Sequence, residues 1–203
     1  MEIRYRRFRI TKGIYDTSRV SFVSISQKAW EAVEKSNLPK FYLNLKSDRK
    51  SLLSNSNPYT PAVNLVFALD EALKMMREEG LDNIFLRHKK HKLAMSSAVK
   101  ALNLKLFADE KYLSPSITAI KTEGIDAEEF RKTIKNNFDI LLAGGQDHLK
   151  GKIFRVGHLG YVNDRDIITV VSAISNTLLS LGKISAQQAG EALDVASKYL
   201  EEN

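Results

Sequence analysis

The sequence contains no cysteine, and this absence excludes several kinds of chemistry. Without thiols the chain can form no disulfide bond, no thiolate nucleophile and no zinc site of the usual cysteine type. Glycine and proline are sparse, with 10 and 4 among 203 residues, so we expect no long disordered linker. No apolar run approaches the roughly 18 residues that span a bilayer. Residues 1–7 are charged with no apolar stretch behind them, which is unlike a secretory signal and indicates a cytoplasmic protein.

A basic charge balance is the most visible feature of the composition. The chain has 31 Lys and Arg residues against 24 Asp and Glu residues, a net charge of +7. Residues 4–9 (RYRRFR) interleave basic and aromatic side chains, a pattern that can grip phosphates and stack on bases. The other interpretation is an edge strand with its charged residues outside. Because no known nucleic-acid-binding module accompanies the stretch, we do not expect nucleic acid to be the partner.

The apolar periodicity predicts helices and short strands in alternation. The strongest helical pattern covers residues 62–79, and Gly80 separates it from a second long helix at 81–102. Further helices are predicted at 27–35, 46–53, 126–136, 164–181 and 185–201. Strands are predicted at 3–10, 20–25, 105–108, 116–121, 138–143 and 152–157. We therefore expect an α/β fold in which a small mixed sheet carries helices on one face.

Three motifs occur in the order and spacing of one known family. They are PYTPAVNL at residues 58–65, AGGQ at 143–146 with LKGK at 149–152, and IFRVGHLG at 153–160. Together they resemble the class V pyridoxal-phosphate-dependent aminotransferases of the alanine–glyoxylate and serine–pyruvate type. The resemblance covers residues 21–181. It implies the C-terminal small domain of fold-type-I pyridoxal-phosphate transferases at 41–203, with the linking helix 62–79, behind a remnant of the cofactor-binding large domain at 1–40.

The resemblance assigns three residues to an active site. Arg155, in the strand motif, would bind the α-carboxylate of the substrate, and its paired guanidinium donors suit that group. Thr60, just ahead of the long helix, would contact the cofactor phosphate of the neighbouring subunit. Lys12 would form the Schiff base with pyridoxal phosphate, which requires an uncharged amine. From the residues alone, Arg155 could instead pair with an Asp, Thr60 could only cap the helix, and Lys12 could be a solvated surface residue.

The activity that the resemblance implies is amino-group transfer between a small amino acid and a 2-oxo acid. The family's Asp facing the pyridinium nitrogen, its stacking aromatic residue and its Gly-rich phosphate loop find no match in this sequence. We therefore expect the isolated chain to be incomplete, and to act as a homodimer or together with a missing N-terminal half. The alternative is a non-catalytic dimerisation or partner domain of a truncated or split enzyme.

The four histidines do not predict a metal site. His88 and His91 lie three residues apart on one predicted helix, but neighbouring lysines oppose a bound cation, so we expect a solvated helix face there and no metal. His148 and His158 flank the strand that carries Arg155. They either line the substrate side or are ordinary loop residues, and the sequence does not decide between these interpretations.

Overall fold

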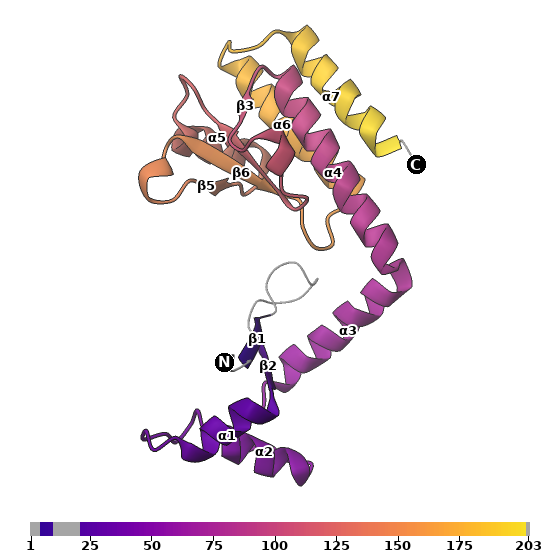
Figure 1. The fold of residues 1–203 in the computed structure, drawn as a ribbon. Coiled ribbons are helices and arrows are strands. Elements are labelled where there is room, and N and C mark those ends of the chain that lie inside the picture. Colours follow the sequence, from indigo (N-terminus) through magenta and orange to yellow (C-terminus); the bar gives the residue numbers. More distant parts are fainter. Residues whose placement is uncertain (1–4, 10–20, 202–203) are drawn as a thin grey trace. The chain divides into compact units, whose positions relative to one another are not determined.

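The computed structural model describes residues 5–9 and 21–201. The chain divides into two compact units, Met1–Met75 and Met76–Asn203, and each is described by itself. Figure 1 draws the helices and strands in chain order, with the first unit in indigo and purple. Across the described ranges, no helix combines the length and the apolar character that a membrane span requires.

The first unit contains a two-stranded antiparallel sheet and two helices, β1 (Tyr5–Arg9), β2 (Ser21–Ile25), α1 (Gln27–Lys35) and α2 (Leu45–Leu53). Helix α1 begins at Ser26, whose Oγ accepts a hydrogen bond from the backbone N–H of Ala29 at 3.3 Å. Helix α2 begins at Asn44, whose Oδ1 accepts from the N–H of Lys46 at 3.1 Å. All four elements lie where the sequence predicts them.

Two long helices follow in the sequence. Helix α3 (Val63–Glu79) begins in the first unit and ends in the second, and α4 (Leu81–Ala101) starts after one intervening residue. That residue, Gly80, has φ of 82°, a backbone conformation that side chains with a Cβ atom rarely adopt. Both predicted long helices, and the glycine between them, are confirmed. The predicted domain boundary after residue 40 rests on the family resemblance and stays a prediction.

The second unit is built on a four-stranded sheet with the strand order β3-β4-β6-β5. Its strands are β3 (Lys105–Leu106), β4 (Ile117–Lys121), β5 (Ala143–Gly144) and β6 (Ile153–Gly157). Strand β4 leads through helix α5 (Ala127–Phe138) to β5, which runs in the same direction, but β6 lies between them. The described strands therefore pair only antiparallel, and the prediction of a mixed sheet is wrong in this respect.

The two faces of this sheet differ in burial. On β4 and β6 the side chains of Ile120, Phe154 and Val156 are buried, whereas Ala119 and Arg155 are only partly buried. Successive residues of a strand point to opposite faces, so one face packs into the core and the other stays open. Arg155 belongs to the open face.

Helices cover the buried face. Helix α4 packs beside the two C-terminal helices, α6 (Asp164–Ser180) and α7 (Ala186–Glu201), as Figure 1 shows. From α5, Phe130 contacts Phe154 of β6, with ring centroids 5.2 Å apart. The predicted α/β fold with a small sheet and covering helices is thereby confirmed.

One predicted strand, at residues 138–143, is wrong. Helix α5 continues to Phe138, and Asp139 then adopts the left-handed conformation, with φ of 55°, and ends the helix. Strand pairing begins only at Ala143, opposite Arg155. A short apolar run fits either a strand or a helix end, because periodicity alone does not say where a partner strand begins.

Candidate active site

Arg155 lies at the middle of β6, on the open face of the sheet. Its register partners are Ala119 on β4 and Ala143 on β5, so only small side chains flank it in its row. The guanidinium Nε donates a hydrogen bond to the carbonyl oxygen of Gly144 at 3.0 Å. Among the described residues, its Nη groups make no hydrogen bond and no ion pair, and no Asp pairs with it. Two parallel donors are therefore available to an anion.

The Gly-Gly pair beside Arg155 allows a close approach of backbone segments. A Cβ atom at Gly144 would lie 2.6 Å from both Arg131 Nη1 and Glu128 Oε1. A Cβ atom at Gly145 would overlap the carbonyl oxygen of Leu149. Any larger residue would move this segment, and with it the Gly144 carbonyl that orients Arg155.

His158 follows β6 directly and is buried, so it does not line a solvent-facing substrate site. Its Nε2 lies 2.9 Å from Oγ1 of Thr118, which is buried as well. Burial, followed by the charge of nearby His91, lowers the pKa of His158 to about 4. His158 is therefore neutral at pH 7. His148, on the other side of β6 in the sequence, is exposed.

His91 on α4 is also fully buried, so the prediction of a solvated helix face is wrong for this residue. Its Nε2 lies 2.8 Å from Asp164 Oδ1. Burial lowers the pKa of His91, although the hydrogen bond to Asp164 opposes this effect. The signal was present in the sequence, because His91 continues the helical spacing from Ile84 to Met95.

The other two predicted site residues lie apart from the second unit. Thr60 belongs to the first unit, just before α3, and its exposed side chain makes no hydrogen bond with the described residues. It does not cap the helix there. Lys12 lies outside the described residues. The roles of Lys12, Thr60 and Arg155 stay predictions.

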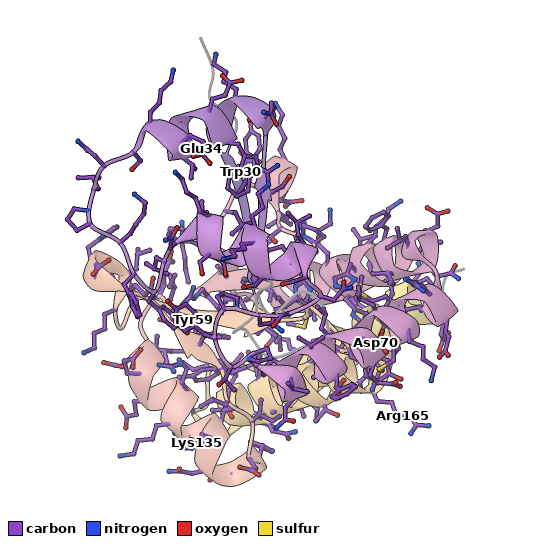
Figure 2. All side chains as sticks on the ribbon, turned by 90° about the horizontal axis from the view of Figure 1, so that it is seen from below. Trp30, Glu34, Tyr59, Asp70, Lys135 and Arg165 are labelled. Atoms are coloured by element: carbon purple, nitrogen blue, oxygen red, sulfur yellow. The ribbon has the colours of Figure 1, made fainter. Side chains whose placement is uncertain are left out.

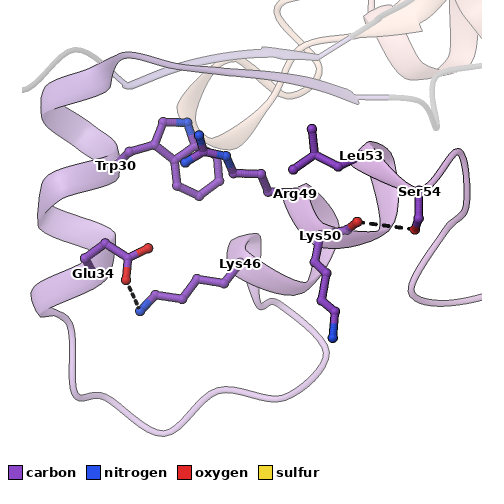
Figure 3. Close-up of a pocket in the computed structure, with 7 residues that line it drawn as sticks. All are labelled: Trp30, Glu34, Lys46, Arg49, Lys50, Leu53 and Ser54. Carbon is purple, nitrogen blue, oxygen red and sulfur yellow. Dashed lines mark hydrogen bonds and ion pairs between the residues drawn. The ribbon is translucent and has the colours of Figure 1, made fainter.

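A groove in the first unit was not found from the sequence. It has a volume of about 360 Å³, and Figure 3 shows its lining by Trp30, Glu34, Lys46, Arg49, Lys50, Leu53 and Ser54. The Arg49 guanidinium carbon lies 4.7 Å from the centroid of the Trp30 ring, and Lys46 Nζ lies 2.6 Å from Glu34 Oε2. The signal was the helical spacing of Lys46, Arg49, Lys50 and Leu53 on α2. The groove is open and polar, and its ion pair and ring contact are of the kind that joins two surface helices.

No cluster of three or more His, Asp or Glu residues with metal-binding geometry occurs in residues 5–9 and 21–201. The candidate site in the second unit is thus an organic one, built from one guanidinium on an open sheet face and the backbone that holds it.

Comparisons with known proteins give mixed names. No protein-family model matches the chain. The chain is 52% identical over 171 residues to the soluble hydrogenase 42 kDa subunit of Anabaena cylindrica, covering 84% of this chain and 45% of that protein. It is 32% identical over 200 residues to serine–glyoxylate aminotransferase of Methylorubrum extorquens, covering 95% and 49%. The crystal structure of ureidoglycine–glyoxylate aminotransferase from Bacillus subtilis matches with a TM-score of 0.86 at 27% identity, covering 98% and 52%.

The chain spans about half the length of the curated relatives it matches. Most of its described fold is shared with a solved aminotransferase, and its sequence is related to aminotransferases over nearly its whole length. The motifs around Thr60, Gly144 and Arg155 point to the same group of proteins. The chain therefore belongs to the class V aminotransferases and corresponds to a C-terminal portion of them.

Proposed function

We propose that this chain serves in the transfer of an amino group between a small amino acid and a 2-oxo acid, with pyridoxal phosphate as cofactor. One observation carries the proposal. Arg155 presents two uncommitted Nη groups on an open sheet face, while its Nε is fixed on the Gly144 carbonyl. The names of the relatives supply the direction, because two of them are glyoxylate aminotransferases. The hydrogenase name suggests no thiolate-bound metal here, because these 203 residues include no cysteine.

Arg155 would bind the α-carboxylate shared by the amino acid and the 2-oxo acid. A guanidinium matches a carboxylate with two parallel charge-assisted hydrogen bonds, and it stays charged at every working pH. The alanines on both sides, Ala119 and Ala143, leave room for a small substrate above the strand. The same arrangement serves donor and acceptor, since both carry the carboxylate next to the reacting carbon.

The donor chemistry of the chain fits the cofactor in part. The exposed Thr60 hydroxyl has no partner among the described residues and suits a phosphate oxygen, which in this family belongs to the neighbouring subunit. Lys12 would hold the cofactor through its Nζ and then move the substrate α-proton as a general base. Bound pyridoxal phosphate would supply the electron sink for the transfer. The proposed domains, 1–40 and 41–203, would place Lys12 and Thr60 in different parts of the protein.

A second candidate function is that of a non-catalytic partner domain, acting in a homodimer or with a separate N-terminal half. Exposed apolar side chains in the first unit support it: Phe41 is 82% exposed, Leu43 83% and Leu53 80%. Apolar surface of this extent favours association. A strictly monomeric mass by light scattering at micromolar concentration and above would count against both forms of association.

Absorbance spectroscopy with added pyridoxal phosphate, borohydride reduction and peptide mapping test the catalytic proposal. Label on Lys12 is the expected result, and label spread over surface lysines contradicts it. In an assembly that binds the cofactor, Arg155→Ala should weaken glyoxylate binding by about 30- to 100-fold and leave cofactor binding unchanged. Equal losses of both would refute the role of Arg155. Arg165→Ala, which removes an exposed guanidinium of α6, is the matched control.

A further inference from the structure

Arg87 on α4 contacts three separate segments of the second unit. Its Nη1 donates to the carbonyl oxygens of Gly160 at 3.0 Å and Val162 at 2.7 Å, in the connection that leaves β6. Its Nε and Nη2 donate to the two carboxylate oxygens of Glu79, at 2.6 and 3.0 Å. Glu79 is the last residue of α3. One guanidinium thus joins the end of α3, helix α4 and the segment that follows the Arg155 strand.

The segment held by Arg87 is specified at several other points. Gly160 has φ of 78°, so its carbonyl direction depends on a residue without a Cβ. His158 donates its backbone N–H to the carbonyl of Ser116, beside β4. One helical turn after Arg87, His91 binds Asp164 at the start of α6. The connection between β6 and α6 is therefore fixed at its beginning, middle and end.

Burial makes these contacts strong enough to matter. The Arg87 side chain is 18% exposed and that of Glu79 is 24% exposed. Removing a partner from a half-buried charged pair leaves the other charge and the carbonyl groups without their hydrogen bonds. A lysine could not replace Arg87, because a single ammonium cannot form the two parallel bonds to a carboxylate and still reach two carbonyl groups in another direction.

We propose that Arg87 is a positioning residue for Arg155, resting on the proposed role of Arg155 in binding the substrate carboxylate. Arg87 locks the chain leaving β6 to the last residue of α3. It thereby keeps β6 in the register that sets Arg155 between Ala119 and Ala143, with its Nε on the Gly144 carbonyl. Substrate affinity would then depend on a contact at the end of α3 that the substrate itself never touches.

The test follows the Nε–H signal of Arg155 by two-dimensional ¹H–¹⁵N NMR of the full chain, assigned by its loss in Arg155→Lys. In the unaltered chain this proton should exchange slowly, because it is hydrogen-bonded to Gly144, and the signal should shift on titration with glyoxylate. In Arg87→Gln the exchange should be at least about tenfold faster and glyoxylate at least about tenfold weaker, as for the loss of one oriented charge-assisted bond. Arg87→Lys should behave like Arg87→Gln.

Arg165→Gln is the matched control, because it removes the same charge from an exposed side chain that points outward in Figure 2. Unchanged exchange and unchanged glyoxylate affinity in a folded Arg87→Gln chain would overturn the proposal, and so would full rescue by Arg87→Lys. If Arg87→Gln does not fold, Glu79→Gln tests the same link, and exchange as slow as in the unaltered chain overturns it. Failure of glyoxylate to shift the signal in the unaltered chain would refute only the proposed function, because the exchange rate still tests the link.

Discussion

The Nε2 atom of His158 and the Oγ1 atom of Thr118 lie 2.9 Å apart, both on buried side chains of the second unit. The folded protein therefore holds a neutral histidine whose pKa, about 4, is below its ordinary value of 6.5. The unfolded chain takes up a proton near pH 6.5, but the folded chain does so only near pH 4. Protonation therefore favours unfolding as the pH falls through this window.

Acid should accordingly destabilise the second unit. Stability that is fully present above pH 6.5 should fall by about 3 kcal/mol by pH 4, and His91, whose pKa is also lowered, acts in the same direction. Urea unfolding between pH 7.5 and pH 4 measures the effect. His158→Gln should flatten the pH dependence, whereas His148→Gln, at an exposed position, should preserve it. An equal slope in the His158→Gln chain would contradict the assignment.

The contact between Phe130 and Phe154 should contribute strongly to stability. Phe130 is 2% exposed and lies against a fully buried ring. Phe130→Ala should lower the free energy of unfolding by about 3–5 kcal/mol, through lost burial and the cavity that remains. Phe85→Ala, on the exposed face of α4, should change it by less than about 1 kcal/mol. Chemical denaturation followed by circular dichroism compares the two, and similar losses would refute the proposed core contact.

Glycine-to-alanine substitutions should have opposite effects at two positions. Gly145→Ala should destabilise the protein by about 1–3 kcal/mol, because the new Cβ atom would overlap the Leu149 carbonyl. Gly190→Ala, within α7 and with open space around it, should stabilise by up to about 1 kcal/mol. Thermal melts report both, and the idea of a tight turn fails if Gly145→Ala melts at or above the temperature of the unaltered chain.

The stacking of Arg49 on Trp30 can be followed directly, because the chain has a single tryptophan. Arg49→Ala should shift the emission of Trp30 to longer wavelength as the ring gains water, and should cost about 0.5–1 kcal/mol. Lys50→Ala removes the same charge one residue away, makes no described contact with the ring, and should leave the spectrum unchanged. Identical spectra for all three chains would exclude the cation–π contact.

The helices were predictable because each carries its own signal. The Ser26 cap, the glycine at position 80 and the apolar spacing of residues 62–79 are local features, and the structure bears them out. The sheet was less predictable, since strand limits depend on partners that lie far away in sequence. The run from Phe138 to Ala143 shows this, because its apolar character says nothing of where β6 will pair.

The candidate site was predictable only in its chemistry. A lone arginine in a strand is ordinary, and it was the family resemblance that singled out Arg155. Its bond to Gly144, and the link from Arg87 to Gly160 across 73 residues of sequence, depend on tertiary structure that no local pattern encodes. His91 was misjudged because the adjacent lysines outweighed its position on the apolar stripe.

Strand β6 comes last in the chain among the four strands of the second unit, yet it lies between β4 and β5. During synthesis, the inner edges of β4 and β5 thus remain without partners until residues 153–157 have left the ribosome. Assembly of the sheet must wait for almost the whole polypeptide and then occur together with docking of the C-terminal helices. Nascent chains stalled before this point would present open backbone edges, which makes them the species most in need of a chaperone.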